Sequence, residues 1–371
     1  MTTASEFDVA IAGGGIVGCT CALACAQRGL RVAIVERDTW GSGATAAGMG
    51  HIVVMDDSEA QFALTRYSQQ LWSAMDLPAA AEYEQTGTLW IAADKDELEA
   101  AERKQAWYTA RGVPAHMLTV HELYEAEKHL APGLAGALLI PEDGVIYPPV
   151  AALALGQRAE ALGAKRFAGR EVKAIGAGRM ELNSGETVLA TRLVLALGAE
   201  STHLAPHIAV RKRKGHLVIT DRYPGYVRHQ LVELGYLKSA HSMGSDSVAF
   251  NVQPRKTGQL LIGSSRQFDA EYAEVDHSIL TAMLARAAIY LPGVAQLNAL
   301  RVWTGFRAAT PDKLPLIGQD TQDPTLLLAT GHEGLGITTS LATAEMIADL
   351  VTGQPTQIPL DPYHPSRAMA A

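Results

Sequence analysis

The sequence predicts an α/β fold in which one domain, built on a βαβ unit, is split along the chain and a β-sheet-rich domain is inserted into it. Three observations predict this. Residues 7–36 run from an apolar segment through a glycine-rich turn and a helical stretch to a second apolar segment. From 215 to about 265 short β-type runs alternate with Gly, Pro and Ser turns. The strand-then-helix pattern returns after residue 326.

The order of these patterns gives the expected domain limits. We place the first domain at 1–82, 145–210 and 310–371, and the inserted domain at 83–144 and 211–309. The chain contains no repeat, low-complexity tract or flexible linker. Two intertwined domains therefore suit the length of 371 residues.

Bulk properties exclude several classes of protein. With 48% hydrophobic and 19% charged residues the chain has enough apolar side chains for a large core. The net charge of −8 gives no electrostatic basis for binding nucleic acid. The chain has no run of 18 consecutive apolar residues, so we expect no membrane span. No signal peptide is evident either, and we therefore expect a cytoplasmic protein.

The three cysteines are expected to be buried thiols. Cys19, Cys21 and Cys25 all fall in one predicted helix, and no second cluster would complete a metal site with them. We therefore predict neither disulfides nor a metal centre.

The first elements follow directly from local signals. Residues 7–12 form an apolar run typical of a buried parallel strand. The turn GGGIVG opens a helix that runs through Leu30, with Gly29 as its C-terminal stop. Residues 31–36 form the second strand. The small-residue stretch GSGATAAGMGH, 41–51, predicts a loop.

The middle of the chain mixes both periodicities. Helical spacing of apolar residues predicts helices, and compact apolar runs predict strands. The expected helices cover 59–77, 94–111 and 150–163; the expected strands cover 86–93 and two runs within 134–149.

Later elements are mostly β. Residues 173–198 carry hairpin punctuation and then a strand, and the basic cluster RKRKGH, 211–216, is interpreted as a solvated or substrate-facing turn. Four strands are expected between 215 and 265, then a helix at 277–290 and a strand within 301–318. The chain ends with a strand at 326–331 and a helix.

A dinucleotide fingerprint lies at the first turn. Gly13, Gly15 and Gly18 give G-x-G-x-x-G directly between a strand and a helix. These glycines permit a tight turn, close approach of a pyrophosphate to the backbone and close helix–strand packing. Glu36 ends the second strand, where a carboxylate accepts from ribose hydroxyls and repels a 2′-phosphate. The fingerprint alone does not separate NAD from FAD.

Three further stretches favour FAD. The loop 41–51 contains little bulk, so its backbone can approach a long, flat ligand, although a flexible surface loop is the alternative. The strand 193–201 ends in small residues. The stretch 326–340 turns from a strand through glycines into a helix, whose N-terminus would stabilise negative charge on a reduced flavin.

Taken together, these motifs resemble a known family. GGGIVG with Glu36-Arg37, ATAAGM (44–49), DGVIYP (143–148), LVLALGA, RVWTGFRAATPDKLPLIG and ATGHEGLG span almost the whole chain. They resemble the FAD-dependent D-amino-acid oxidase family, in the branch with glycine oxidase and sarcosine oxidase. The segments AAGMGHIVVMDDS (46–58) and RKGHLVIT (213–220) most resemble bacterial D-hydroxyproline dehydrogenase-like members.

The resemblance implies a Rossmann-like FAD-binding domain of the GR2 type and a β-sheet-rich α+β substrate domain. It also implies FAD contacts throughout the first domain. Those positions are Gly13, Gly15, Ile16, Val17, Gly18, Glu36, Arg37, Ala44, Thr45, Ala47, Gly48, Met49, Val172, Ala196, Gly198, His332, Glu333, Gly334, Leu335, Gly336, Ile337 and Thr338. No cysteine falls at the covalent attachment site of the sarcosine-oxidase type, and Thr45 stands where covalent relatives carry histidine. We therefore predict FAD held noncovalently.

Arg307 is the first candidate for substrate binding. It lies in the apolar, aromatic context WTGFRAATP, where a guanidinium needs an anionic partner, and its planar fork suits a carboxylate. A structural salt bridge is the alternative. The resemblance places the family's carboxylate-binding arginine here. It also implies an arginine two residues after His332 in the glycine-oxidase type, whereas this chain has Gly334, which leaves room for a bulkier, ring-shaped substrate.

Other substrate contacts are expected from His51, Tyr236, Trp303 and His332, with a structural role as the alternative for each. The implied reaction is oxidation of the C–N bond of a D-amino or secondary amino acid to an imine, with a D-hydroxyproline- or D-proline-like substrate. Oxidation of a 2-hydroxy acid, or a role as an FAD-carrying subunit of a larger dehydrogenase, remains an alternative. The electron acceptor stays open between oxygen, quinone and a partner subunit.

Overall fold

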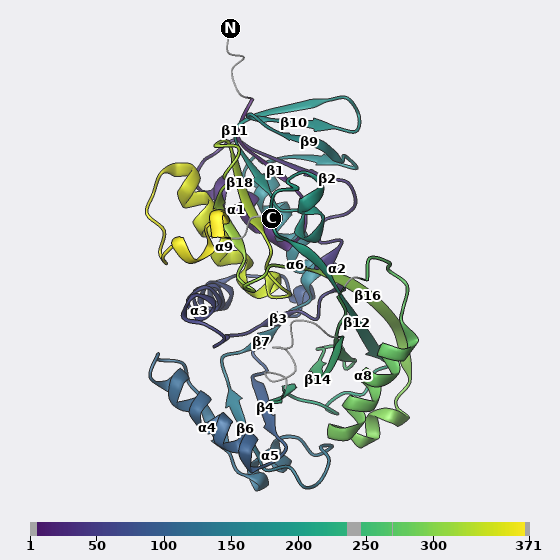
Figure 1. The fold of residues 1–371 in the computed structure, drawn as a ribbon. Helices are drawn as coiled ribbons and strands as arrows, with labels where there is room; N and C mark the ends of the chain where they lie inside the picture. Colours follow the sequence, from purple (N-terminus) through teal and green to yellow (C-terminus); the bar gives the residue numbers. More distant parts are fainter. Residues whose placement is uncertain (1–5, 236–245, 269, 368–371) are drawn as a thin grey trace.

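The computed structural model of the chain describes residues 6–235, 246–268 and 270–367. Two lobes lie one above the other in Figure 1. Within the described residues, each lobe is built on an eight-stranded sheet, and a two-stranded sheet of β3 (His51–Ile52) and β7 (Gly144–Val145) lies where they meet. The predicted α/β class is therefore confirmed.

The upper sheet is mainly parallel. Its strands follow the order β17-β18-β11-β1-β2-β8, with a β9–β10 extension on β11. Parallel strands covered on both faces are built from continuous apolar runs, and Val9 to Ala12 of β1 are accordingly fully buried. Its strands are β1 (Phe7–Ala12), β2 (Val32–Glu36), β8 (Lys165–Ala168), β9 (Val172–Gly176), β10 (Arg179–Leu182), β11 (Thr187–Leu195), β17 (Leu316–Gln319) and β18 (Leu326–Thr330).

Helices of the upper lobe pack on this sheet and on one another. Helix α1 (Ile16–Gln27) contacts both α6 (Pro148–Ala161) and α9 (Gly336–Thr352), while α3 (Glu59–Ala74) contacts α9. Gly29 has φ +76° just beyond α1, so it ends that helix as predicted. Short 3₁₀ segments cover Ala79–Ala81, Gly198–His203, Pro292–Gln296, Asp361–Tyr363 and Pro365–Arg367.

The lower sheet has the order β16-β12-β15-β14-β13-β4-β6-β5. Its strands are β4 (Thr88–Ala92), β5 (His116–Leu118), β6 (Gly136–Ile140), β12 (Arg211–Thr220), β13 (Gln230–Glu233), β14 (Ser247–Pro254), β15 (Leu260–Arg266) and β16 (Ala299–Ala309). Its helices are α4 (Lys95–Thr109), α5 (Val120–Ala126) and α8 (His277–Tyr290). The strands of the upper sheet lie within the ranges expected for the first domain, and those of the lower sheet lie within the ranges expected for the inserted domain. The domain limits themselves stay a prediction.

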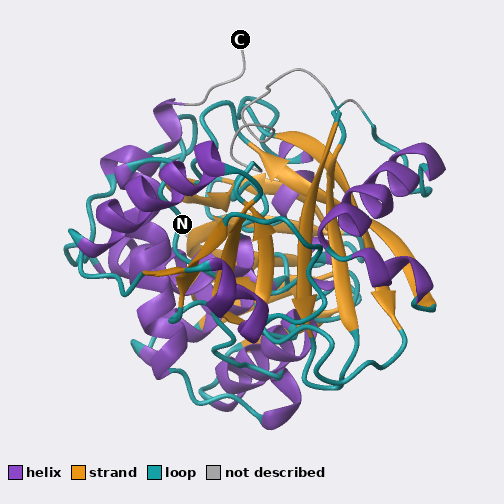
Figure 2. Cartoon of the chain, turned by 90° about the horizontal axis from the view of Figure 1, so that it is seen from below, coloured by secondary structure: helices purple, strands orange, loops and turns teal. Residues whose placement is uncertain are grey.

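The two faces of the lower sheet have different roles. Successive residues of a strand point to opposite faces. Leu89 and Ile91 accordingly join the core beneath α8, whereas Trp90 between them packs on the α4 side. Phe250 and Asn251 alternate in the same way, because only Phe250 belongs to the core beneath α8. Figure 2 shows these strands from below with helices around them.

Two expectations about local structure were wrong. The basic cluster 211–216 is not a turn but the first half of β12, where Arg213 and Lys214 are buried. Burial is tolerated because Arg213 pairs with Glu333, and the Lys214 ammonium lies 3.8 Å from the Tyr272 ring centroid. The loop 41–51 contains a helical turn, α2 (Ala44–Ala47).

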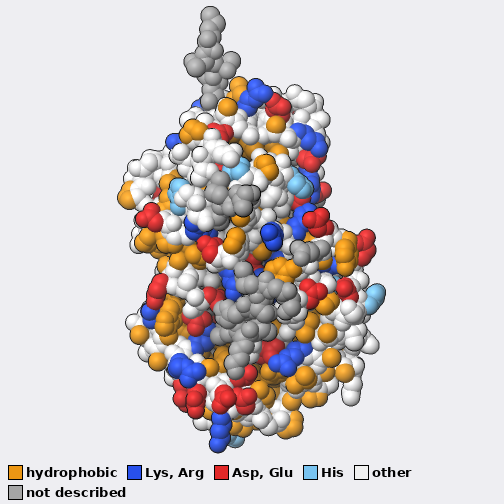
Figure 3. Space-filling view, in the orientation of Figure 1, with side chains coloured by type: hydrophobic (Ala, Val, Ile, Leu, Met, Phe, Trp, Pro, Cys, Tyr) orange, Lys and Arg blue, Asp and Glu red, His pale blue; other side chains and the backbone are white. Residues whose placement is uncertain are grey.

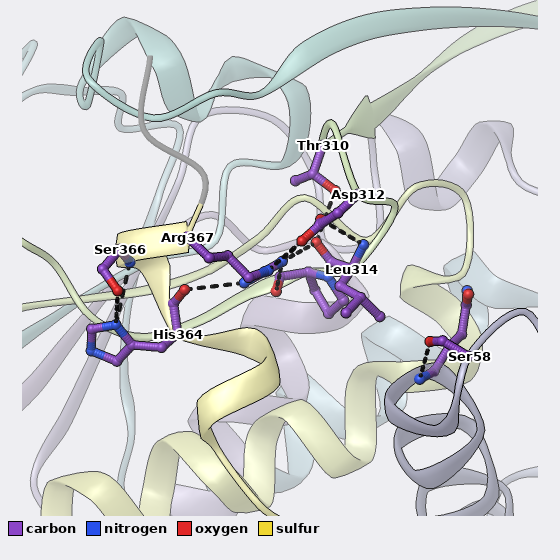
Figure 4. Close-up of polar contacts among 9 residues, drawn as sticks. Ser58, Thr310, Asp312, Leu314, His364, Ser366 and Arg367 are labelled. Carbon is purple, nitrogen blue, oxygen red and sulfur yellow. Dashed lines mark hydrogen bonds and ion pairs between the residues drawn. The ribbon is translucent and has the colours of Figure 1, made fainter. Parts of the chain in front are cut away.

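The end of the described chain holds the turn that joins the lower lobe to β17. Arg367 pairs with Asp312 at 2.6 Å and donates to the Leu314 carbonyl at 2.6 Å (Figure 4). The Thr310 hydroxyl donates to the same carbonyl at 2.8 Å. These contacts fix the exit of β16, the strand that carries Arg307.

Asp143 is a buried carboxylate where the lobes meet. It accepts from the Val54 backbone at 3.1 Å and from Gln69 Nε2 at 2.9 Å. Burial raises the pKa of Asp143 to about 7, although its hydrogen bonds and the Lys104 charge act in the opposite direction. The folded protein therefore binds this proton more tightly than the unfolded chain does.

The first prediction concerns the pH dependence of stability. The contribution of Asp143 is fully present at acid pH and is lost as pH rises through about 7. Asp143→Asn does not titrate, so its free energy of unfolding should rise relative to wild type from about pH 4 to about pH 7 and stay level above that. Urea unfolding across that range measures the difference, with exposed Asp76→Asn as the control. A difference that is flat with pH, or falls, would contradict the assignment.

Candidate active site

A cavity of ≈ 650 Å³ lies between the two lobes. It extends from the glycine turn before α1 to Arg307 on β16 and Trp90 on β4. Figure 3 shows lysine and arginine side chains at the waist between the lobes on this face. The cavity is lined by six basic residues, Arg37, Arg170, Arg213, Arg266, Arg307 and Lys313, and by six acidic ones, Glu36, Asp38, Asp57, Glu171, Glu200 and Glu333.

Most of the residues expected at the cofactor and substrate line this one cavity. They are Gly13, Gly15, Ile16, Val17, Glu36, Arg37, Ala44, Thr45, Ala47, Gly48, Met49, His51, Val172, Ala196, Gly198, Arg307 and every residue from His332 to Ile337. Gly18, Trp303 and Thr338 are not part of its lining. Tyr236 lies outside the described residues.

The glycine turn has no room for side chains. A Cβ on Gly13 would lie 2.5 Å from the Ala196 carbonyl oxygen, and one on Gly18 would lie 1.8 Å from the Gly13 carbonyl oxygen. Helix α1 starts with no acidic residue in its first turn and Gly15 as its N-cap. Its N-terminal N–H groups and dipole therefore favour an anion. Glu36 is held in place because its Oε2 accepts from the Gly14 backbone at 2.6 Å.

The segment 44–51 is anchored by the lower lobe at two of its carbonyls. Trp303 Nε1 donates to the Ala47 carbonyl at 3.3 Å, and Gln253 Nε2 donates to the Met49 carbonyl at 2.8 Å. Met49 also packs in a buried cluster with Leu217 on β12. Trp303 therefore positions this segment, and it does not line the cavity.

The upper lobe holds the same segment from the other side. The Ile16 N–H of α1 donates to Thr45 Oγ1 at 3.0 Å, and Thr338 Oγ1 of α9 donates to the His51 carbonyl at 2.7 Å. Gly50 has φ +98°, and a Cβ there would lie 2.0 Å from the Ile146 carbonyl oxygen. Only glycine fits this position.

The start of α9 also faces the cavity. The helix begins at Gly336 with neither a side-chain cap nor an acidic residue in its first turn. Trp72 Nε1 donates to the Ile337 and Thr338 carbonyls at 3.1 and 3.0 Å, which fixes the first turn. Its N-terminus is thus a second place in the cavity where negative charge is stabilised.

Arg307 lies flat against backbone that carries no side chain. A Cβ on Gly215 would lie 2.5 Å from Arg307 Nη1, and one on Gly334 would lie 2.9 Å from its Cδ. Nη1 donates to the Ser265 carbonyl at 3.0 Å. Gly334 therefore makes room for the stem of Arg307, a geometry that a side chain at position 334 would disturb.

The two histidines of the cavity differ in their surroundings. His51 Nε2 is buried and has no hydrogen-bond partner within the described chain, and burial with the nearby Arg307 charge lowers the pKa of His51 to about 4. His332 Nε2 is bonded to Thr343 Oγ1 at 3.1 Å, and burial lowers its pKa to about 4. Both rings are therefore uncharged at neutral pH.

Arg213 was missed as a site residue. It lines the cavity beside Arg307, its neighbour in the β12–β16 register, and pairs with Glu333. The available signal was the β-type run from His216 to Thr220, which continues the same strand.

The profile of a family described as FAD dependent oxidoreductase matches residues 8–350. The chain belongs to this family. Glycine oxidase of Geobacillus kaustophilus (strain HTA426) is 29% identical over 379 residues, which cover 98% of this chain and 97% of that protein. The crystal structure of G. kaustophilus glycine oxidase superposes with a TM-score of 0.86 over 98% of this chain and 99% of that one.

Two further relatives carry other names. The structure of L-proline dehydrogenase from P. horikoshii is 25% identical, with a TM-score of 0.87 over 98% of both chains. A subunit of opine oxidase from Rhizobium meliloti is 25% identical over 350 residues, covering 89% of this chain and 90% of that one. The expected family and the FAD cofactor are thus confirmed for this FAD-dependent oxidoreductase.

Two further findings concern membrane-spanning helices and the cysteines. Of the helices in the described part of the chain, none combines the length and apolar character needed to span a bilayer. The three cysteines are free and buried, and burial raises the pKa of each thiol. Noncovalent attachment of FAD stays a prediction.

The second prediction tests the glycine turn. In Gly18→Ala the new Cβ meets the Gly13 carbonyl, so α1 must move away from β1 and the turn deforms. We expect FAD affinity to fall by at least about tenfold, as a loss of roughly 1.4 kcal/mol would produce, measured by FAD titration of apoprotein. Gly29→Ala, at the open end of the same helix, should leave FAD affinity unchanged. Normal FAD affinity in Gly18→Ala would contradict the assignment.

Proposed function

We propose that this FAD-dependent oxidoreductase oxidises the C–N bond of a D-amino or secondary amino acid, with a D-hydroxyproline- or D-proline-like ring as substrate. The observation that carries the proposal is Arg307. Its guanidinium lines the same cavity as the glycine turn and both helix N-termini, over a backbone kept bare by Gly215. A planar fork in this position suits a substrate carboxylate.

The cavity fits FAD along its length. The side-chain-free turn at Gly13 and Gly15 and the N-terminus of α1 would hold the pyrophosphate. Glu36 would accept from the ribose hydroxyls, and Val172 at the start of β9 would meet the adenine. The anchored segment from Ala44 to Met49 and the start of α9 would hold the isoalloxazine ring.

The chain itself binds and orients the substrate. Arg307 holds the carboxylate, which fixes the neighbouring amine and C–H bond in one orientation. His51, neutral and with an unpartnered Nε2, would accept a proton from the bound ammonium. The carboxylate also cancels part of the Arg307 charge that lowers the pKa of His51, so His51 becomes a stronger base when substrate binds.

When bound, FAD supplies the acceptor for a hydride, which consists of two electrons and one proton and leaves from the carbon beside the amine. The product is an imine, which hydrolyses in water. The chain need only position the substrate and exclude water from the reacting bond.

The names of three relatives support an amino-acid substrate. Glycine oxidase, L-proline dehydrogenase and opine oxidase are all named for the oxidation of amino-acid-like compounds. The space left by Gly334 is occupied by the stem of Arg307, so this glycine does not itself distinguish a ring-shaped substrate from glycine. Because the opine oxidase relative is named as one subunit of its enzyme, a partner protein is a candidate electron acceptor here, beside quinone and oxygen.

The third prediction tests Arg307. Arg307→Lys retains the charge but loses the bidentate fork, so kcat/KM for D-proline should fall by roughly 10- to 100-fold, as expected for losing a charged hydrogen bond. The FAD content should not change. Arg301→Lys, an exposed position on the same strand, is the matched control. Full turnover in Arg307→Lys would contradict carboxylate capture by this residue.

A further inference from the structure

Polar side chains form a row on the cavity face of the lower sheet, away from Arg307. Trp90 on β4 is in register with Val232 on β13, which in turn is in register with Asn251 on β14. Gln230 lies two residues before Val232 and so points to the same face. Trp90, Gln230 and Asn251, here called the polar wall, all line the cavity.

Each residue of the polar wall is buried and leaves a polar atom unsatisfied. Their exposed fractions are 4%, 2% and 6%. Trp90 Nε1, Gln230 Oε1 and Asn251 Oδ1 have no hydrogen-bond partner within the described ranges. Buried polar atoms are nearly always paired, so three orphans on one stretch of cavity wall indicate a partner that the chain itself does not supply.

The amide of Gln230 has a defined orientation. Its Nε2 donates to Thr88 Oγ1 at 2.9 Å. Thr88 therefore accepts from Gln230, and Oε1 is left as an acceptor. Trp90 Nε1 can only donate, and the amide of Asn251 can do either.

This combination suits a neutral group that both donates and accepts, and a hydroxyl is the smallest such group on an amino acid. A hydroxyl donates to Gln230 Oε1 or Asn251 Oδ1 and accepts from Trp90 Nε1. A carboxylate has no hydrogen for Gln230, and an ammonium cannot accept from Trp90. An unsubstituted ring carbon leaves all three buried polar atoms without a hydrogen-bond partner.

The polar wall and Arg307 lie on different strands of one sheet. Arg307 is on β16, the edge strand, while the wall is on β4, β13 and β14 at the other side of β12 and β15. Resting on the proposed function, we propose that the substrate carries a hydroxyl on the side remote from its carboxylate, and that Trp90, Gln230 and Asn251 bind it. The enzyme thereby selects hydroxylated cyclic amino acids over unsubstituted ones.

The test compares both epimers of 4-hydroxy-D-proline with D-proline in the holoenzyme. We expect kcat/KM for one hydroxylated epimer to exceed that for D-proline by roughly 10- to 100-fold, since D-proline leaves buried polar groups unpaired. Asn251→Ala and Gln230→Leu should remove most of this preference. Both should lower kcat/KM for the hydroxylated substrate far more than for D-proline, because the lost bond is made only to the hydroxyl.

Controls separate the possible outcomes. Asn251 Oδ1 has no partner to lose, so Asn251→Ala should keep its FAD content and melting temperature even if Gln230→Leu misfolds. Ser247→Ala, on the same strand but outside the cavity lining, should leave kcat/KM unchanged for both kinds of substrate. Equal rates for D-proline and both epimers in wild type, or a preference that survives both variants, would overturn the hydroxyl site while leaving the proposed function intact. If no cyclic amino acid reduces the flavin, both proposals fall.

Discussion

Hydrogen bonds from both lobes to the segment Ala44–His51 decide how the cavity is shaped. Trp303 and Gln253 reach it from the lower sheet, while Ile16 and Thr338 reach it from the first turns of α1 and α9. The two helix N-termini and the strand that carries Arg307 are thereby held against one short piece of backbone. Small residues there, with Gly50 at a positive φ, allow that close approach. Loosening any of these contacts would change the relative placement of the cofactor and substrate ends together.

Charge in the cavity follows the same plan. The cofactor end offers helix N-termini, and the substrate end offers Arg307 against bare backbone, beside the Arg213–Glu333 pair. Neutral histidines lie between them, because burial and the neighbouring guanidinium disfavour a further positive charge. The remote end carries amides and an indole instead of charges. A zwitterionic substrate with a neutral polar group opposite its carboxylate matches this gradient.

The sequence was most informative where local signals and burial agree. The strand before Gly13, the helix ended by Gly29 and the strand ending at Glu36 have the predicted bounds within one to three residues, because turn glycines and apolar runs are local features. It failed at RKRKGH, where charge suggested a turn. The pairing that makes Arg213 buried comes from Glu333, far along the chain. Trp303 stays a predicted substrate contact, and only tertiary structure shows that its indole N–H donates to the Ala47 carbonyl. The polar wall had no signal at all, since Gln230 and Asn251 become neighbours only through sheet register.

The central claim is that the bound flavin accepts a hydride from a cyclic or N-alkyl amino acid whose carboxylate lies on Arg307. Anaerobic mixing of the holoenzyme with D-proline, 4-hydroxy-D-proline, sarcosine, glycine and 2-hydroxy acids, while following the visible absorption of the flavin, tests it most directly. We expect rapid bleaching by a cyclic amino acid, with stoichiometric formation of the imine. Bleaching by 2-hydroxy acids with none by any amine would contradict it.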